Sequence, residues 1–158
     1  MKSTKQLWVF TLVATLLVLL GCNDLPETLV ASGYDEKEMD AAIARAQDEV
    51  DAFIAELGSP TGSDHAVKAP VEDNGKTEHF WLVEVEYNDG AFTGQIGNDP
   101  GIVKNVEIGQ AWTLKKDEIS DWMYMRDGKM HGNYTMRPLL KTLPKEEAEE
   151  LRSILAEP

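Results

Sequence analysis

Cysteine and histidine are scarce in this chain of 158 residues. Cys22 is the single cysteine, so the sequence holds neither a pair for an intramolecular disulfide nor a zinc-binding cysteine pattern. The three histidines lack the close spacing typical of a metal site. Neither Ser-His-Asp catalysis nor a phosphate-binding glycine loop is indicated. We therefore expect no metal and no cofactor, and the sequence favours a protein that is not an enzyme.

Basic residues are also few. The chain has 15 lysines and arginines against 28 aspartates and glutamates, which gives a formal net charge of −13 at pH 7. Binding to nucleic acid needs clustered basic side chains, and adsorption to anionic lipid depends on the same residue types. The composition therefore argues against both partners. The simplest role of the negative charge is to keep the domain soluble.

The most apolar stretch lies at the start of the sequence. Lys2 and Lys5 precede a mostly apolar run from Leu7 to Leu20. As a helix these fourteen residues would measure about 21 Å, whereas the hydrocarbon core of a bilayer is roughly 30 Å thick. This layout predicts a secretory signal peptide over residues 1–21 rather than a permanent membrane span.

The apolar run ends in Leu19-Leu20-Gly21-Cys22, which resembles the lipobox of bacterial lipoproteins. The resemblance implies cleavage after Gly21 and lipid on Cys22, so that a domain facing the periplasm is anchored in the bacterial cell envelope. Asn23, directly after the cysteine, favours the outer membrane over the inner one. The processed chain would keep 13 basic and 28 acidic residues, a formal charge of −15.

The processed chain divides into a linker and one domain. Residues 22–34 contain the cysteine and a stretch without periodicity, and residues 35–158 have the length of a single domain. Residues 36–57 show an apolar stripe at spacings of three and four, which predicts an amphipathic helix capped by Asp35. A second helix is expected over residues 145–155 after Pro144. Its predicted inner face consists of Ala148, Leu151, Ile154 and Leu155.

Between the two helices the hydrophobic period changes to two, which is typical of strands. Residues 65–73 contain Pro70 and are therefore expected to form an edge strand. Residues 77–87 predict the strongest strand, followed by a turn at 88–90 and a partner strand in 91–98. The alternation assigns one face of residues 77–87 to His79, Trp81, Val83, Val85 and Tyr87, and the other to Phe80, Leu82, Glu84 and Glu86.

Further strands are expected over residues 103–108, 111–115 and 118–125, whereas residues 126–129 read as a loop and 132–144 as irregular. The predicted fold class is α+β. We expect a curved, mainly antiparallel sheet of about five strands, packed by the first helix and closed by the C-terminal helix.

Three stretches together resemble a known bacterial family. They are EHFWLVEV with FTGQIGNDP, then IGQAWTL leading to ISDWMY, and finally GKMHGNYTMRPLL. This pattern is similar to the YegJ-like proteins, which carry domain of unknown function 2314, and it covers most of residues 64–143. The resemblance implies an α+β domain that is sometimes lipid-anchored and has no established reaction.

Several polar and aromatic residues are candidates for a binding site, because they lie where strands end and loops begin. Our first hypothesis is a non-catalytic module that holds a protein or small molecule on the curved sheet near Trp81, Trp122 and Arg137. The tryptophans could equally be core residues, and Arg137 could pair with an internal carboxylate. The ligand-binding candidates are His79, Trp81, Asn98, Trp122, Asn133, Thr135 and Arg137.

Two other functions remain open at this point. An envelope hydrolase could use Asp121 and His131, provided that both side chains come within about 3 Å of a common point. Asp121 could instead accept a backbone N–H at a turn. An immunity-type protein that neutralises a basic toxin is suggested by resemblance to domains found near toxin systems, and the acidic charge would suit it.

Overall fold

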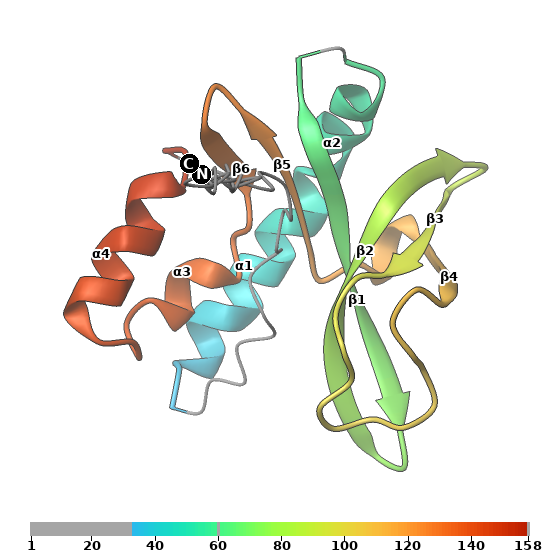
Figure 1. The fold of residues 1–158 in the computed structure, drawn as a ribbon, viewed down its shortest axis with the longest axis horizontal. Helices are drawn as coiled ribbons and strands as arrows, with labels where there is room; N and C mark the ends of the chain where they lie inside the picture. Colours follow the sequence, from blue (N-terminus) through green and yellow to red (C-terminus); the bar gives the residue numbers. More distant parts are fainter. Residues whose placement is uncertain (1–32, 60, 158) are drawn as a thin grey trace, which may run out of the picture.

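The computed structural model describes residues 33–59 and 61–157 (Figure 1). Cys22, the signal peptide and most of the linker lie outside the described residues. The helices are α1 (Glu36–Asp48), α2 (Val50–Leu57), α3 (Met136–Leu139) and α4 (Lys145–Ile154), with a 3₁₀ turn η1 at Lys116–Glu118. The strands are β1 (Ser63–Asp73), β2 (Lys76–Asn88), β3 (Ala91–Ile96), β4 (Ala111–Lys115), β5 (Asp121–Arg126) and β6 (Lys129–Gly132).

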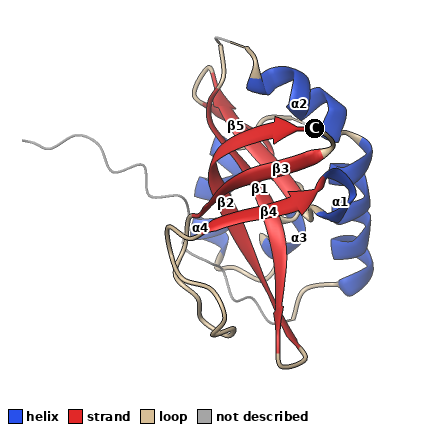
Figure 2. Cartoon of the chain, turned by 90° about the vertical axis from the view of Figure 1, so that its right-hand side faces the viewer, coloured by secondary structure: helices blue, strands red, loops and turns tan. Residues whose placement is uncertain are grey.

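The strands form one antiparallel sheet of six in the order β4-β3-β2-β1-β5-β6. The predicted α+β fold with a curved sheet is therefore confirmed, with six strands in place of about five. Figure 2 shows the sheet strongly twisted, with β3 and β4 running across the direction of β1. Within the described part of the chain, no helix has the length and apolar character needed to span a membrane.

The first helix forms where the apolar stripe predicts it, but in two pieces. The Asp35 carboxylate caps α1 by accepting a hydrogen bond from the backbone N–H of Glu38 at 3.1 Å. Glu49 interrupts the helix for one residue, and α2 continues to Leu57. Phe53 on α2 is fully buried and stacks on Trp122 of β5 at 5.4 Å between ring centroids. The two helices thus cover one face of the sheet.

The two faces of the sheet carry separate cores. On the face covered by α1 and α2, Phe53 packs with Phe80, Phe92 and Trp122. On the opposite face, side chains from β1, β2, β5 and β6 pack against α3 and α4. These side chains are Ala66, Trp81, Met123 and Met130, and they meet Met136, Leu140, Ala148 and Leu155. Any site on this sheet must therefore be assigned to one face.

The predicted alternation along β2 is wrong beyond Val83. Glu84 has a φ of 52°, and the pairing between β2 and β3 shifts between Val83 and Glu86. A β-bulge inserts one extra residue, so the later side chains exchange faces. As a result, Val85 and Tyr87 pack on the same core as Phe80 rather than opposite it.

The prediction that residues 65–73 form an edge strand is also wrong, because β1 lies between β2 and β5. The carbonyl oxygen of Lys68 accepts a hydrogen bond from Ser120 on the β5 side. Alternate residues of a strand direct their backbone groups to the same side, so Pro70 also faces that side. Pairing with β5 ends at Lys68 opposite Asp121, and Pro70 lies beyond it. The missing N–H of Pro70 therefore removes no bond from the ladder.

Residues 103–108 form a loop rather than the predicted strand. The buried Glu78 carboxylate accepts three backbone N–H bonds from this loop, at 2.8 Å from Gly101, 2.7 Å from Ile102 and 3.0 Å from Val103. Val103 and Val106 are buried in the core below. The apolar residues of 103–108 are thus buried as part of a loop. Sequence periodicity cannot distinguish such a loop from a short strand.

The end of the chain is more ordered than its sequence suggests. β6 pairs with β5 through a tight turn at Asp127 and Gly128, both with positive φ. After α4, Leu155 forms a parallel bridge with Met130, and the backbone N–H of Ala156 donates to the carbonyl of Met130 at 2.8 Å. The C-terminal segment therefore covers the outer edge of β6.

Candidate functional site

The helices α1 and α3 pack beside each other (Figure 1). Their side chains line a groove. Its volume is about 300 Å³, at the lower end of the range for small-molecule sites. It is lined by Glu38, Ala41, Ala42 and Arg45 of α1 and by Tyr134, Arg137, Pro138 and Lys141. Arg137 is the one member of the predicted binding set that lines this groove.

Two guanidinium groups lie close to the ring of Tyr134. The Arg45 guanidinium lies 4.6 Å from the centroid of the Tyr134 ring, and the Arg137 guanidinium lies 5.9 Å from it. The Tyr134 hydroxyl donates a hydrogen bond to Glu49, whose other carboxylate oxygen accepts from Nε of Arg45 at 2.8 Å. Burial and the Glu49 carboxylate raise the pKa of Tyr134 to about 12. Tyr134 is therefore neutral at physiological pH.

Arg137 is only partly used by its surroundings. Its Nη2 donates to the carbonyl oxygen of Ala156 at 3.1 Å, whereas its buried Nε has no acceptor among the described residues. A guanidinium carries five N–H donors in a planar fork that matches carboxylate and phosphate oxygens. Arg45 and Arg137 thus bring two cations with spare donors to one end of the groove.

The other end of the groove carries an ion pair. Nζ of Lys141 lies 2.6 Å and 2.7 Å from the two carboxylate oxygens of Glu38. Ala41, Ala42 and Pro138 line the groove with small apolar surfaces. The groove can therefore accept a ligand with an anionic group at the Arg45 end and little bulk beside it.

Asp121 fixes the segment that carries Tyr134. Its fully buried carboxylate accepts backbone N–H bonds from Trp122 at 2.9 Å, Tyr134 at 3.1 Å and Thr135 at 2.8 Å. The Thr135 hydroxyl donates to the same carboxylate at 2.6 Å. Asp121 thus behaves as the backbone acceptor that the sequence allowed as an alternative to a catalytic acid, and it positions one wall of the groove.

A second polar cluster lies beside Asp121 on the same face of the sheet. Nζ of Lys68 donates to the Thr135 hydroxyl at 2.6 Å and lies 4.4 Å from the Trp81 ring centroid. Burial lowers the pKa of Lys68, although the Asp121 carboxylate opposes the shift. Nδ1 of His79 lies 2.8 Å from the Ser120 hydroxyl, and desolvation together with the charge of Lys68 lowers the pKa of His79. Sequence reasoning named neither Lys68 nor Ser120.

The remaining sequence candidates do not join the groove. The side-chain oxygen of Asn98 accepts from the backbone of Trp81 at 3.0 Å. Asn133 is fully buried, with a φ of 47° and its backbone N–H bonded to the carbonyl of Trp122. The Asn98 side chain therefore holds backbone in place, whereas the Asn133 side chain donates to the sulfur of Met130 at 3.0 Å and its buried oxygen has no partner among the described residues.

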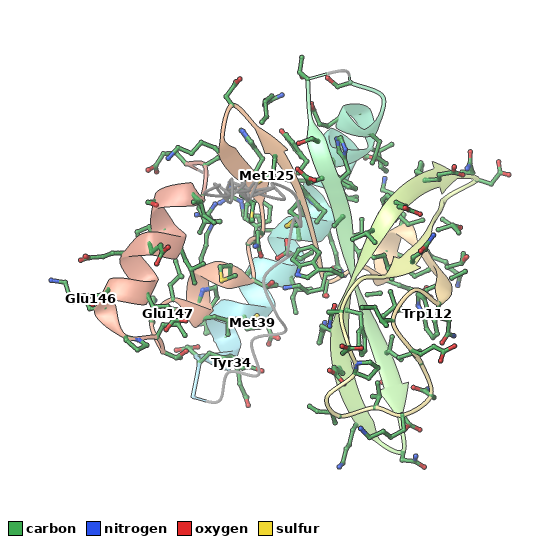
Figure 3. All side chains as sticks on the ribbon, in the orientation of Figure 1. Tyr34, Met39, Trp112, Met125, Glu146 and Glu147 are labelled. Carbon is green, nitrogen blue, oxygen red and sulfur yellow. The ribbon has the colours of Figure 1, made fainter. Side chains whose placement is uncertain are left out.

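Trp81 and Trp122 do not share a surface. Trp122 is buried under α1, and its indole N–H donates to the carbonyl of Ala46 at 2.9 Å, whereas Trp81 packs on the opposite face. Trp112, on β4, lies far from Glu146 and Glu147 of α4 (Figure 3). A binding surface near Trp81, Trp122 and Arg137 together is thus not formed.

Asp121 and His131 lie on opposite faces of the sheet. The His131 ring stacks on Tyr124 at 4.8 Å, on the face that also carries Trp122. Asp121 precedes Trp122 in β5 and projects to the other face, where its partner Thr135 meets Lys68. The common point that the hydrolase hypothesis requires is therefore not formed.

Sequence reasoning missed Arg45 and Tyr134, the two residues that complete the groove with Arg137. Arg45 and Glu49 are four residues apart on a helix, which in a sequence is typical of a solvent-exposed ion pair. Tyr134 follows Asn133 in a stretch without periodicity. No signal in the sequence links either residue to Arg137, because their proximity arises only when α3 packs on α1.

Comparison with known proteins identifies relatives of the whole domain. The family model described as "Uncharacterized protein conserved in bacteria (DUF2314)" matches residues 36–155. The chain is 53% identical over 135 residues to the uncharacterized protein YegJ of Escherichia coli (strain K12), covering 85% of this chain and 88% of that protein. No solved structure matches the chain.

A second relative shares a region of the chain. The identity is 35% over 80 residues with a putative ankyrin repeat protein of Neisseria meningitidis serogroup B. The match covers 50% of this chain and 31% of that protein. The shared region is thus a minor part of the longer relative.

Proposed function

The chain belongs to the DUF2314 family of bacterial proteins, and we propose that it is a lipid-anchored envelope protein whose groove between α1 and α3 binds an anionic group of a ligand. In this proposal the domain is a non-catalytic binding module. One observation carries it: the Arg45 and Arg137 guanidiniums both lie close to the Tyr134 ring at the groove, and the buried Nε of Arg137 has no acceptor among the described residues.

Electrostatics support an anion at this place. Two guanidinium groups close to one ring repel each other, and Glu49 neutralises one of them through its bond to Arg45. The charge of Arg137 is met by a neutral carbonyl, that of Ala156. A carboxylate or phosphate would provide a charge-assisted acceptor, and each such bond contributes about 1.5–3 kcal/mol.

The proposed location rests on the sequence. The signal-like run over residues 1–21 and the lipobox-like Leu19-Leu20-Gly21-Cys22 support export and lipid on Cys22. A linker over residues 22–34 would then keep the groove near the membrane surface. A binding module tethered in this way meets ligands of the envelope rather than of the cytoplasm.

The proposal is tested with a defined carboxylate probe. We expect the full-length protein in detergent micelles to bind N-acetyl-alanyl-alanine, detected by saturation-transfer NMR, and to bind the corresponding C-terminal amide much more weakly. Arg137→Ala should abolish this preference. Arg152→Ala, an exposed arginine on α4, is the matched control and should leave it unchanged. Equal binding of acid and amide, or an unaffected Arg137→Ala variant, would refute the anion site.

The other functions are weighed by the same geometry. The separation of Asp121 and His131 on opposite faces removes the arrangement on which the hydrolase hypothesis rested. Neutralisation of a toxin stays a prediction, which co-expression with the products of neighbouring genes would test.

A further inference from the structure

The groove between α1 and α3 has a cationic end and an end where a carboxylate is paired with a lysine. Arg45 and Arg137 form the cationic end, next to Tyr134. Glu38 lies at the other end and is paired with Lys141. This order follows from the antiparallel packing of the two elements, because Arg45 late in α1 meets Tyr134 before α3, while Glu38 early in α1 meets Lys141 after it.

The distance between the two ends follows from helix geometry. Glu38 and Arg45 are seven residues apart on α1, which corresponds to about 10 Å at 1.5 Å per residue. Both line the groove on the same side as Ala41 and Ala42. An extended peptide covers about 3.3–3.6 Å per residue, so two or three residues match this length.

We infer that the ligand of the groove is a short zwitterionic peptide of two or three residues, a conclusion that rests on the anion-binding function proposed above. Its terminal carboxylate is held by Arg45 and Arg137. Its terminal ammonium is held by Glu38. The alanines of α1 and Pro138 leave room for small side chains between the two charged ends.

Lys141 is paired with Glu38 and therefore competes with the ligand ammonium for that carboxylate. Its side chain is 64% exposed and that of Glu38 is 43% exposed, so water screens the pair. Exchanging Lys141 for the ammonium of a bound peptide replaces one ion pair by another. The exchange releases the flexible Lys141 side chain, while the peptide ammonium forms an ion pair with the Glu38 carboxylate.

This exchange predicts an unusual effect of removing Lys141. Lys141→Gln leaves Glu38 without its competitor, so the affinity for a free peptide should rise about three- to fivefold, the size of one exposed ion pair. The affinity for an N-acetylated peptide should not rise, because it has no ammonium to place at Glu38. A lysine that merely stabilises the fold would not produce this difference.

The decisive experiment uses four forms of trialanine with the full-length protein in micelles: free, N-acetylated, C-amidated and blocked at both ends. We expect the free form to bind most tightly and each single block to weaken binding. Glu38→Gln should cancel the effect of N-acetylation and leave the effect of C-amidation, and Arg137→Ala should do the reverse. Glu36→Gln, an exposed glutamate in the same turn of α1, should change neither.

The outcomes separate the two proposals. If C-amidation weakens binding and N-acetylation does not, the anion site stands and the zwitterionic ligand is refuted. If neither block matters, both are refuted. Thermal unfolding of each variant, followed by circular dichroism, confirms that the compared proteins are folded, so a lost preference reports on the groove.

Discussion

Gly132 stands where β6 leaves the sheet and the chain turns toward the groove. Its φ is 74°, and a Cβ at this position would lie 2.3 Å from the carbonyl oxygen of Trp122 and 2.5 Å from its ring. Gly128 has a similar φ of 71°, but a Cβ there would meet no atom within 4 Å. Alanine at either glycine would strain the backbone, but only alanine at Gly132 would also clash with Trp122.

We expect Gly132→Ala to lower the free energy of unfolding by about 3 kcal/mol or more, since strain and overpacking add. Gly128→Ala should cost about 1 kcal/mol, because it carries the strain without the clash. Urea denaturation followed by tryptophan fluorescence measures both. Equal losses for the two variants would contradict the close approach of Gly132 to Trp122.

Glu78 provides a second test at the scale of one residue. Burial raises the pKa of the Glu78 carboxyl, but the three backbone N–H donors of the loop and Lys104 outweigh it, so the pKa lies below its usual 4.5. A depressed carboxyl pKa stabilises the fold above the unfolded-state value, and this stabilisation is lost as the pH falls through the folded-state pKa.

We therefore expect Glu78→Gln to destabilise the protein by about 2 kcal/mol at pH 7, where the carboxylate is fully charged. The difference from the parent protein should shrink once the pH falls well below 4.5, the ordinary pKa of the group. Unfolding curves between pH 7 and pH 3 measure it. Glu86→Gln, an exposed glutamate on the same strand, is the control. A constant difference across this range would show that the carboxylate charge is not involved.

Individual residues show which parts of the candidate site could be predicted from the sequence. The sequence allowed two roles for Asp121, a catalytic acid or an acceptor of backbone N–H bonds. The four hydrogen bonds that its carboxylate accepts favour the second role. Arg137 was selected for its planar fork, and it does line a groove. Its partner Arg45 was out of reach, because their proximity depends on how α3 packs on α1 rather than on either local sequence.

At the scale of elements, α4 offers a comparison between neighbours. The sequence assigned both Ile154 and Leu155 to the inner face, yet the exposed fraction is 38% for Ile154 and 7% for Leu155. The helix ends at Ile154, so Leu155 is already extended and bridges to Met130 of β6. The helical spacing therefore no longer applies to Leu155.

We expect Leu155→Ala to lower the free energy of unfolding by about 2–3 kcal/mol, because it leaves a cavity between the C-terminal segment and β6. Ile154→Ala should cost less than about 1 kcal/mol. Chemical denaturation of the two variants gives the comparison directly. A larger loss at Ile154 would place the helix face as the sequence predicted and contradict the observed packing.

The elements themselves were largely predictable, and the exceptions have physical causes. The two main helices and strands β1 to β5 follow from hydrophobic period, capping and turn residues. The bulge at Glu84 could not be recognised in the sequence. One inserted residue moves the following side chains to the other face of the sheet without changing the composition of the strand. Pro70 misled, since its effect depends on where the neighbouring strand β5 begins.

For the whole molecule, the groove could not be predicted because its walls are far apart in the sequence. Arg45 and Tyr134 are separated by 88 intervening residues that build the sheet, and their contact is a property of the assembled fold. The net charge of −13 pointed away from an anion site. A global charge is a sum, and it does not exclude a local concentration of cations.

The proposed attachment to the envelope is tested at Cys22. We expect mass spectrometry of the parent protein to show cleavage after Gly21 and acyl chains on Cys22. Cys22→Ser should carry no acyl chains, because serine lacks the thiol that takes the lipid. An unmodified thiol, or residues 1–21 still present in the parent protein, would contradict the proposed anchor.

The last residues connect the far end of the chain to the ligand groove. Ala156 donates its backbone N–H to Met130 and offers its carbonyl to Arg137. Proteolytic trimming of this segment would release the guanidinium, and a bulky affinity tag fused behind it would crowd the same spot. The position of Arg137 in the groove thus depends on the segment that follows α4.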